Sequence, residues 1–100
     1  MELEEKLSAI EKLEPRNDWL TIALEKAIAP LYEEIEAAPE EYRDDFWGTV
    51  EIEKVLTPEK LKRYERIRML LGRRYWQLCR RQEKIRQTLT IDECERMIIS

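Results

Sequence analysis

Apolar residues recur three and four positions apart along most of the chain, which is the spacing of one face of an α-helix. The longest such pattern predicts one helix over about residues 58–87. Thr57 is a good capping residue and Pro58 suits the first helical turn, so the start of this helix is well defined. Its inward positions, of which Gln82 is the polar member, are Leu61, Tyr64, Ile67, Leu71, Tyr75, Leu78, Gln82 and Ile85.

Shorter patterns predict two helices in the N-terminal part. Residues 3–13 carry an apolar stripe that stops before a proline. Asn17 or Asp18 then caps a second helix over about residues 18–37. Its apolar spacing continues through Pro30, so we expect one kinked helix, with two shorter helices as the alternative.

The next segments are less regular. Pro39 fits the first turn of a third helix, which Gly48 would end. Residues 49–56 alternate apolar and charged side chains as a strand does, but a lone strand has no partner, so a short helix or an extended linker is favoured. Thr90 and Glu93 form a capping box at the start of the last helix. The apolar side of that helix consists of Ile91, Cys94, Met97 and Ile98.

Together these elements predict an all-α fold: a four- to five-helix bundle built around the long helix of the C-terminal half, in a single domain over residues 1–100. At 1.5 Å per residue the long helix would measure ~45 Å, more than the ~35 Å width of a compact domain of this length. The helix therefore breaks at Gly72, belongs to an elongated bundle, or protrudes into a partner. A homodimer is a further way to cover it.

The composition argues against an enzyme and against a metal site. Of the 100 residues 40 are charged and none is His, which removes the commonest general base and metal ligand. No phosphate-binding loop or nucleophile motif is present, so we expect no enzyme, no cofactor, no metal and no small-molecule substrate. Without a signal peptide or an apolar run of roughly 20 residues, we expect a cytoplasmic protein without membrane contact. Cys79 and Cys94 are expected to be buried, reduced thiols.

Charge is segregated along the chain. Residues 1–53 hold 16 acids and 5 bases, whereas residues 54–100 hold 6 acids and 13 bases. At 100° per residue, the cations of the long helix gather on one side, opposite its apolar stripe. This candidate basic face consists of Lys62, Arg63, Arg66, Arg73, Arg74, Arg80, Arg81 and Lys84. The candidate acidic patch consists of Glu33, Glu36, Glu40, Glu41, Asp44 and Asp45.

A face of one sign repels itself, so something should compensate it. The chain's own acidic half, an acidic protein partner and nucleic-acid phosphate are the three alternatives. We interpret the chain as a non-enzymatic small helical binding protein (an adaptor, assembly factor or inhibitor) that docks charged helical faces onto a macromolecular partner. Two alternatives stay open: nucleic-acid binding through the basic face, and an acidic, phosphate-mimicking inhibitor that uses the N-terminal half.

Four further side chains flank the apolar stripe of the long helix. Trp76 and Met69 are expected in the core rather than at an interface, because a chain of this length has few large side chains to bury. Arg68 and Arg86 point into the edge of the stripe. Either their stems extend so that the guanidinium groups reach water, or the guanidinium groups meet carboxylates across an interface.

Overall fold

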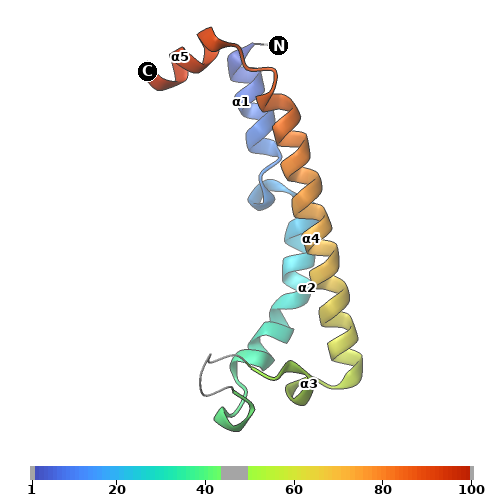
Figure 1. Cartoon of the computed structure of the whole chain (residues 1–100). Helices are drawn as coiled ribbons and strands as arrows, with labels where there is room; N and C mark the ends of the chain where they lie inside the picture. Colours follow the sequence, from blue (N-terminus) through green and yellow to red (C-terminus); the bar gives the residue numbers. More distant parts are fainter. Residues whose placement is uncertain (1, 44–49, 100) are drawn as a thin grey trace. The chain divides into compact units, whose positions relative to one another are not determined.

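The computed structural model describes residues 2–43 and 50–99, and every regular element in these ranges is a helix (Figure 1). The α-helices are α1 (Leu3–Lys12), α2 (Trp19–Glu36), α3 (Ile52–Val55), α4 (Pro58–Arg86) and α5 (Ile91–Ile99), with 3-10 turns at Pro15–Asn17 and Glu40–Tyr42. The predicted all-α class is confirmed. None of the helices in the described ranges is both long enough and apolar enough to cross a bilayer.

The chain divides into two compact units. The first unit combines Met1–Ile22 with Arg73–Ser100, and the second unit is Ala23–Gly72. The first unit therefore holds α1, the first turn of α2, the second half of α4 and α5. The second unit holds the remainder of α2, α3 and the first half of α4.

In the second unit, apolar side chains of α2 pack against those of α4. The buried cluster consists of Ile28, Leu31, Leu56, Tyr64, Ile67 and Leu71. The Tyr32 and Tyr64 rings meet edge to face, with their centroids 5.8 Å apart. Helix α2 continues through Pro30, so one helix is correct and two shorter ones are not.

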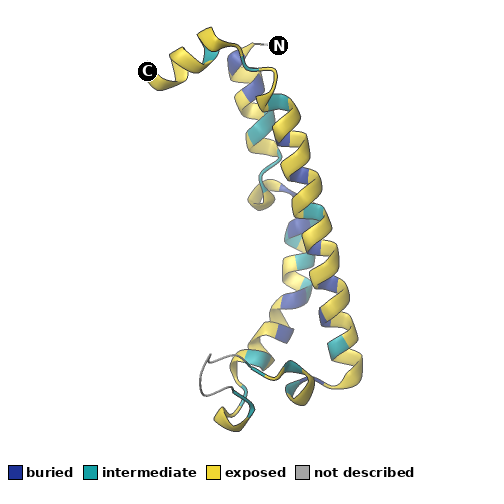
Figure 2. Ribbon diagram, in the orientation of Figure 1, coloured by how far each residue is buried: buried dark blue, intermediate teal, exposed yellow. Residues whose placement is uncertain are grey.

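In the first unit, α1 lies beside the second half of α4 (Figure 1). Leu3 of α1 and Leu78 of α4 are buried, and Figure 2 marks such positions in dark blue. The Gln82 side-chain amide donates a 3.1 Å hydrogen bond to the backbone carbonyl of Ile10, which lies in the last turn of α1. The Ile10 carbonyl also accepts a hydrogen bond from the Leu13 N–H, at 3.1 Å, so Gln82 adds a second donor there and ties α4 to the end of α1.

The prediction of a third helix starting at Pro39 is wrong for the residues that the structure describes there, which are residues 39–43. Only one 3-10 turn follows Pro39, and Arg43 is extended because it forms an isolated antiparallel bridge with Val50. The adjacent Glu51 N–H donates to the Tyr42 carbonyl at 2.8 Å, so pairing with the returning chain replaces helical hydrogen bonds. The expected stop at Gly48 lies outside the described residues. The short-helix alternative for residues 49–56 is confirmed by α3.

The long helix and the last helix begin where the sequence predicts. The Lys60 N–H donates to the Thr57 hydroxyl at 3.3 Å, as in an N-cap. The predicted capping box is also present: the Thr90 N–H donates to Glu93 Oε1 at 3.0 Å, and the Glu93 N–H donates to Thr90 Oγ1 at 3.2 Å. The alternative that α4 breaks at Gly72 is wrong, since the helix is continuous there.

Candidate binding surfaces

The basic side of α4 in the first unit is open to solvent. Its exposed cations are Arg73, Arg80, Arg81 and Lys84. None of the four has a carboxylate of a described residue within ion-pair distance. Within this unit, the acidic part of the chain therefore does not neutralise these four side chains.

Arg74 belongs to the predicted basic face but is committed to an internal contact. Its Nε and Nη2 donate to Oδ2 and Oδ1 of Asp18 at 2.9 and 2.7 Å, and both side chains are largely buried. Asp18 Oδ2 also accepts hydrogen bonds from the backbone N–H and the hydroxyl of Thr21, at 2.9 and 2.7 Å. Asp18 therefore caps α2 and ties that helix to α4.

These contacts stabilise the charged form of the carboxylate. Hydrogen bonds from Arg74 and then Thr21 hold the pKa of Asp18 well below its ordinary value, although burial acts in the opposite direction. The hydrogen bond with Asp18 likewise raises the pKa of Arg74. Arg74 is thus an internal brace, and no sequence pattern indicated its partner, which lies 56 positions away.

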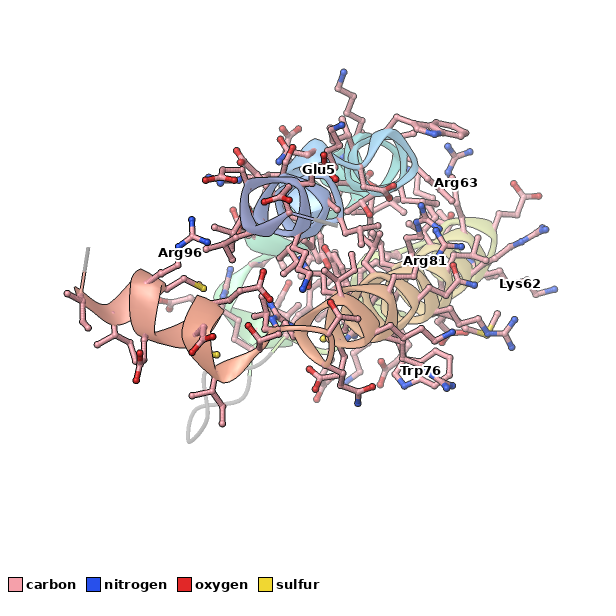
Figure 3. The ribbon with its side chains drawn as sticks, turned by 90° about the horizontal axis from the view of Figure 1, so that it is seen from above. Glu5, Lys62, Arg63, Trp76, Arg81 and Arg96 are labelled. Atoms are coloured by element: carbon pink, nitrogen blue, oxygen red, sulfur yellow. The ribbon has the colours of Figure 1, made fainter. Side chains whose placement is uncertain are left out.

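Trp76 is exposed, which corrects the expectation that it lies in the core. It is 60% exposed and points away from α1 (Figure 3). The Arg80 guanidinium lies over its ring, 4.7 Å from the centroid. No described helix of the first unit covers this flank of α4, so the ring and its cation face solvent together.

Met69 and the two cysteines are also exposed rather than buried. Both thiols are free. Cys79 and Met69 lie beside the inward stripe of α4 rather than within it, and the apolar side of α5, which includes Cys94, is largely uncovered in the first unit. Periodicity assigned all three to an apolar side or its edge, but no described helix of the unit to which each belongs covers it.

In the second unit, Lys62, Arg63 and Arg66 are exposed and have no ion pair with a described residue. Lys60, outside the predicted face, forms an ion pair with Glu34 of α2. A groove of about 480 Å³ adjoins this pair. It is lined by Ala27, Pro30, Leu31, Glu59, Lys60 and Arg63.

The two arginines at the edge of the stripe have partners within α4. The Arg68 guanidinium donates to the Tyr64 hydroxyl at 3.4 Å and lies 5.6 Å from the centre of that ring. Arg86 forms a long ion pair with Glu83, at 3.9 Å. Neither arginine meets a carboxylate of another helix in the described residues.

The acidic patch lies in the second unit and is described only in part. Glu33, Glu36, Glu40 and Glu41 are exposed, whereas Asp44 and Asp45 lie outside the described residues. The four glutamates form no ion pair with a described residue. Arg43 approaches this segment, but it donates to the Glu36 backbone carbonyl, at 2.7 Å.

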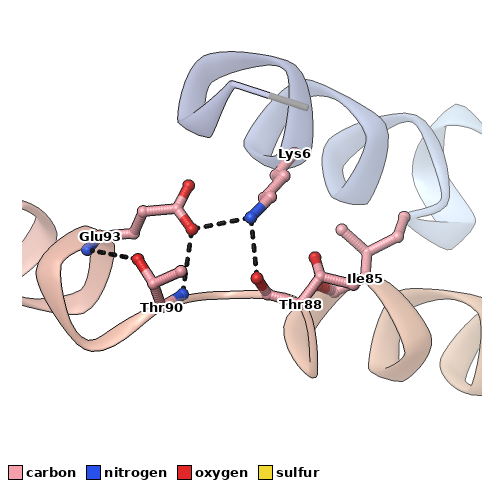
Figure 4. Close-up of polar contacts among 5 residues, drawn as sticks. All are labelled: Lys6, Ile85, Thr88, Thr90 and Glu93. Carbon is pink, nitrogen blue, oxygen red and sulfur yellow. Dashed lines mark hydrogen bonds and ion pairs between the residues drawn. The ribbon is translucent and has the colours of Figure 1, made fainter.

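A polar junction that the sequence did not reveal anchors α5 to α1 (Figure 4). Lys6 of α1 is buried, and its Nζ donates to the Thr88 carbonyl at 2.8 Å and to Glu93 Oε1 at 2.7 Å. The hydrogen bond from Lys6, with those of Thr90, lowers the pKa of Glu93 to about 2. The sequence held one signal for this junction: a lysine, Lys6, lies within the apolar stripe of residues 3–13.

Next to this junction, α1 and α5 form a groove of about 540 Å³ in the first unit. Its apolar walls are Leu3 and Leu7 of α1 and Met97 and Ile99 of α5, and its rim carries Glu4, Glu95 and Arg96. Arg96 forms an exposed ion pair with Glu4, at 3.8 Å. The outer side of α5 is strongly apolar, and Ile98 is 83% exposed.

Among the described residues, no three Cys, Asp or Glu side chains form a group that could hold a metal ion. No protein-family model matches the chain, and neither a curated protein nor a solved structure shows significant similarity to it. Function must therefore be argued from these surfaces.

Proposed function

We propose that this chain is a non-enzymatic helical binding protein that docks the basic side of α4 in the first unit onto an acidic surface of a protein partner. The observation that carries the proposal is the group of four exposed cations, Arg73, Arg80, Arg81 and Lys84, without an ion pair to a described residue. Side chains of one sign on one helix repel each other, so an anionic partner gains from neutralising them.

The exposed ring of Trp76 supports a protein partner. Trp and Arg are the residues most enriched among interface positions that carry binding energy. Here the two types are in contact, because Arg80 lies over the Trp76 ring. Such a pair offers an apolar surface together with a charge that can orient an acidic partner.

Nucleic acid is the second candidate, and the same pair favours it. Bases stack on exposed aromatic rings, and neighbouring cations bind the phosphates. The chain as a whole carries a net charge of −4, whereas nucleic-acid-binding domains are usually strongly basic. We therefore place the protein partner first. A four- to five-helix bundle, a cytoplasmic location and an inhibitory role for the acidic patch remain predictions.

The test is affinity capture from a lysate of the native host with and without nuclease. The binding variant reverses three exposed cations, Arg73→Glu, Arg81→Glu and Lys84→Glu. Arg74 is left intact because its reversal would break the contact with Asp18 and unfold the region. The matched control reverses the same number of exposed cations elsewhere: Lys12→Glu, Arg16→Glu and Lys26→Glu.

We expect the binding variant to lose the captured protein while the control retains it, with the same helicity by circular dichroism in both variants. Loss of capture should also follow added salt, because screening weakens exposed charge pairs. Equal capture by both variants would contradict the proposal. Partners that disappear only after nuclease treatment would support the nucleic-acid alternative instead.

A further inference from the structure

The first unit carries an apolar groove and, on another side, a projecting aromatic ring with arginines beside it. The groove lies between α1 and α5, and the ring is that of Trp76. We infer that a second copy of this chain docks here, with the Trp76 of each copy inserted into the α1–α5 groove of the other. This inference does not rest on the proposed function, but it uses the same side of α4, so a second copy and an acidic partner would compete for Trp76 and Arg80.

The groove has the properties that an indole ring requires. Its volume of about 540 Å³ lies within the usual range of binding pockets, which accept molecules larger than one indole. Leu3, Leu7, Met97 and Ile99 make the walls apolar. Filling the groove would remove from water both the ring and these apolar walls, which is the main favourable term in association.

The charges around the two surfaces are complementary. Arg73 and Arg80 flank Trp76, whereas Glu4 and Glu95 lie at the rim of the groove. Arg96 also lies at the rim and is paired with Glu4. That pair is long and well exposed, so it contributes little and Glu4 can exchange Arg96 for an arginine of the second copy.

A second copy can satisfy both surfaces at once. About three helical turns separate Trp76 from the end of α4, and the groove lies between α1 and the second half of α5. In the proposed dimer, antiparallel copies bring each Trp76 to the groove of the other copy. A two-fold axis would then repeat the same contact twice and close the assembly as a dimer. An unrelated acidic partner would cover the arginines but would leave the groove open.

The measurement is sedimentation equilibrium of the full chain over about 5–500 μM. We expect a species of twice 12.2 kDa. Trp76→Ser should weaken dimerisation about 30-fold or more, as for the loss of an interface anchor. The matched control is Trp19→Ser, which removes a Trp that is 75% exposed in the same unit but does not line the groove, and it should leave the dimer unchanged.

A charge exchange tests the arrangement itself. Arg80→Glu alone and Glu95→Arg alone should each weaken the dimer about tenfold, and the double variant should recover most of that loss. A wild-type chain that stays monomeric throughout, equal effects of the two Trp variants, or a double variant no better than the single ones would each overturn the inference. A monomer that still captures an acidic protein would overturn this inference alone, and a dimer that captures nothing would overturn only the proposed function.

Discussion

Replacing Asp18 separates its two structural roles. Asp18→Asn keeps one carbonyl oxygen that can cap α2 through Thr21, but the amide cannot accept the two hydrogen bonds from Arg74. Asp18→Ala removes the cap as well. In both variants Arg74, whose side chain is only 15% exposed, is left without its carboxylate.

The magnitude follows from these contacts. Hydrogen bonds to charged groups contribute about 1.5–3 kcal/mol, so Asp18→Asn should lower the free energy of unfolding by about 2–3 kcal/mol. Loss of an N-cap costs about 1 kcal/mol more, which brings Asp18→Ala to about 3–4 kcal/mol. In urea unfolding followed by circular dichroism, the Ala variant should lower the midpoint by about 1–4 M, because m-values in urea are about 1–3 kcal/mol/M for small proteins. Asp92→Asn, at an exposed carboxylate, is the matched control.

Acidification gives an independent check of the same contact. The pKa of Asp18 is lower in the folded state than in the unfolded state. Its contribution to the free energy of unfolding is therefore fully present above the unfolded-state pKa of about 3.9, and it is lost as the pH falls through the folded-state pKa. The difference between wild type and Asp18→Asn should therefore shrink from about pH 5 downward. A loss below about 0.5 kcal/mol at neutral pH, or a difference that stays constant into acid, would refute the reasoning.

Three further predictions concern other parts of the chain. Gly72→Ala should raise the free energy of unfolding by about 0.5–1 kcal/mol in urea, because the added Cβ meets no atom within 4 Å and Ala favours helix. Lys6→Met should release α5 from α1 and speed amide hydrogen exchange in α5. Acid should also release α5, measured as lower amide protection relative to the intrinsic exchange rate at each pH, since the pKa of Glu93 is lowered to about 2 and its contribution to stability, present above its ordinary pKa of 4.5, is lost as the pH falls toward 2. Cys79 and Cys94 should both react with a thiol reagent without denaturant.

Each of these predictions can be contradicted by a specific result. A destabilised Gly72→Ala variant would mean that the space beside α4 is not open. Lys12→Met, at an exposed lysine of α1, is the control for Lys6→Met, and equal exchange in the two variants would show that the buried lysine does not anchor α5. Reaction of either thiol only after unfolding would contradict its exposure.

The sequence by itself determined most of the helices. Apolar spacing and local caps place the start of α4 at Thr57 and the start of α5 at Thr90, because an N-cap is formed by residues three positions apart or fewer. The spacing also identified most of the inward stripe of α4, including Gln82. The helix expected after Pro39 failed because a non-local bridge between Arg43 and Val50 competes with helical hydrogen bonds.

Only the tertiary structure decided which neighbour each face meets. Periodicity placed Arg74 on the basic face, but its role as a brace depends on Asp18, 56 positions away. It placed Trp76 at the edge of an apolar stripe without showing that no described helix of the first unit covers that edge. The periodicity of a helix fixes the direction of its side chains. Burial and charge pairing depend on the helices packed against it, and these are brought together by contacts between residues far apart in the sequence.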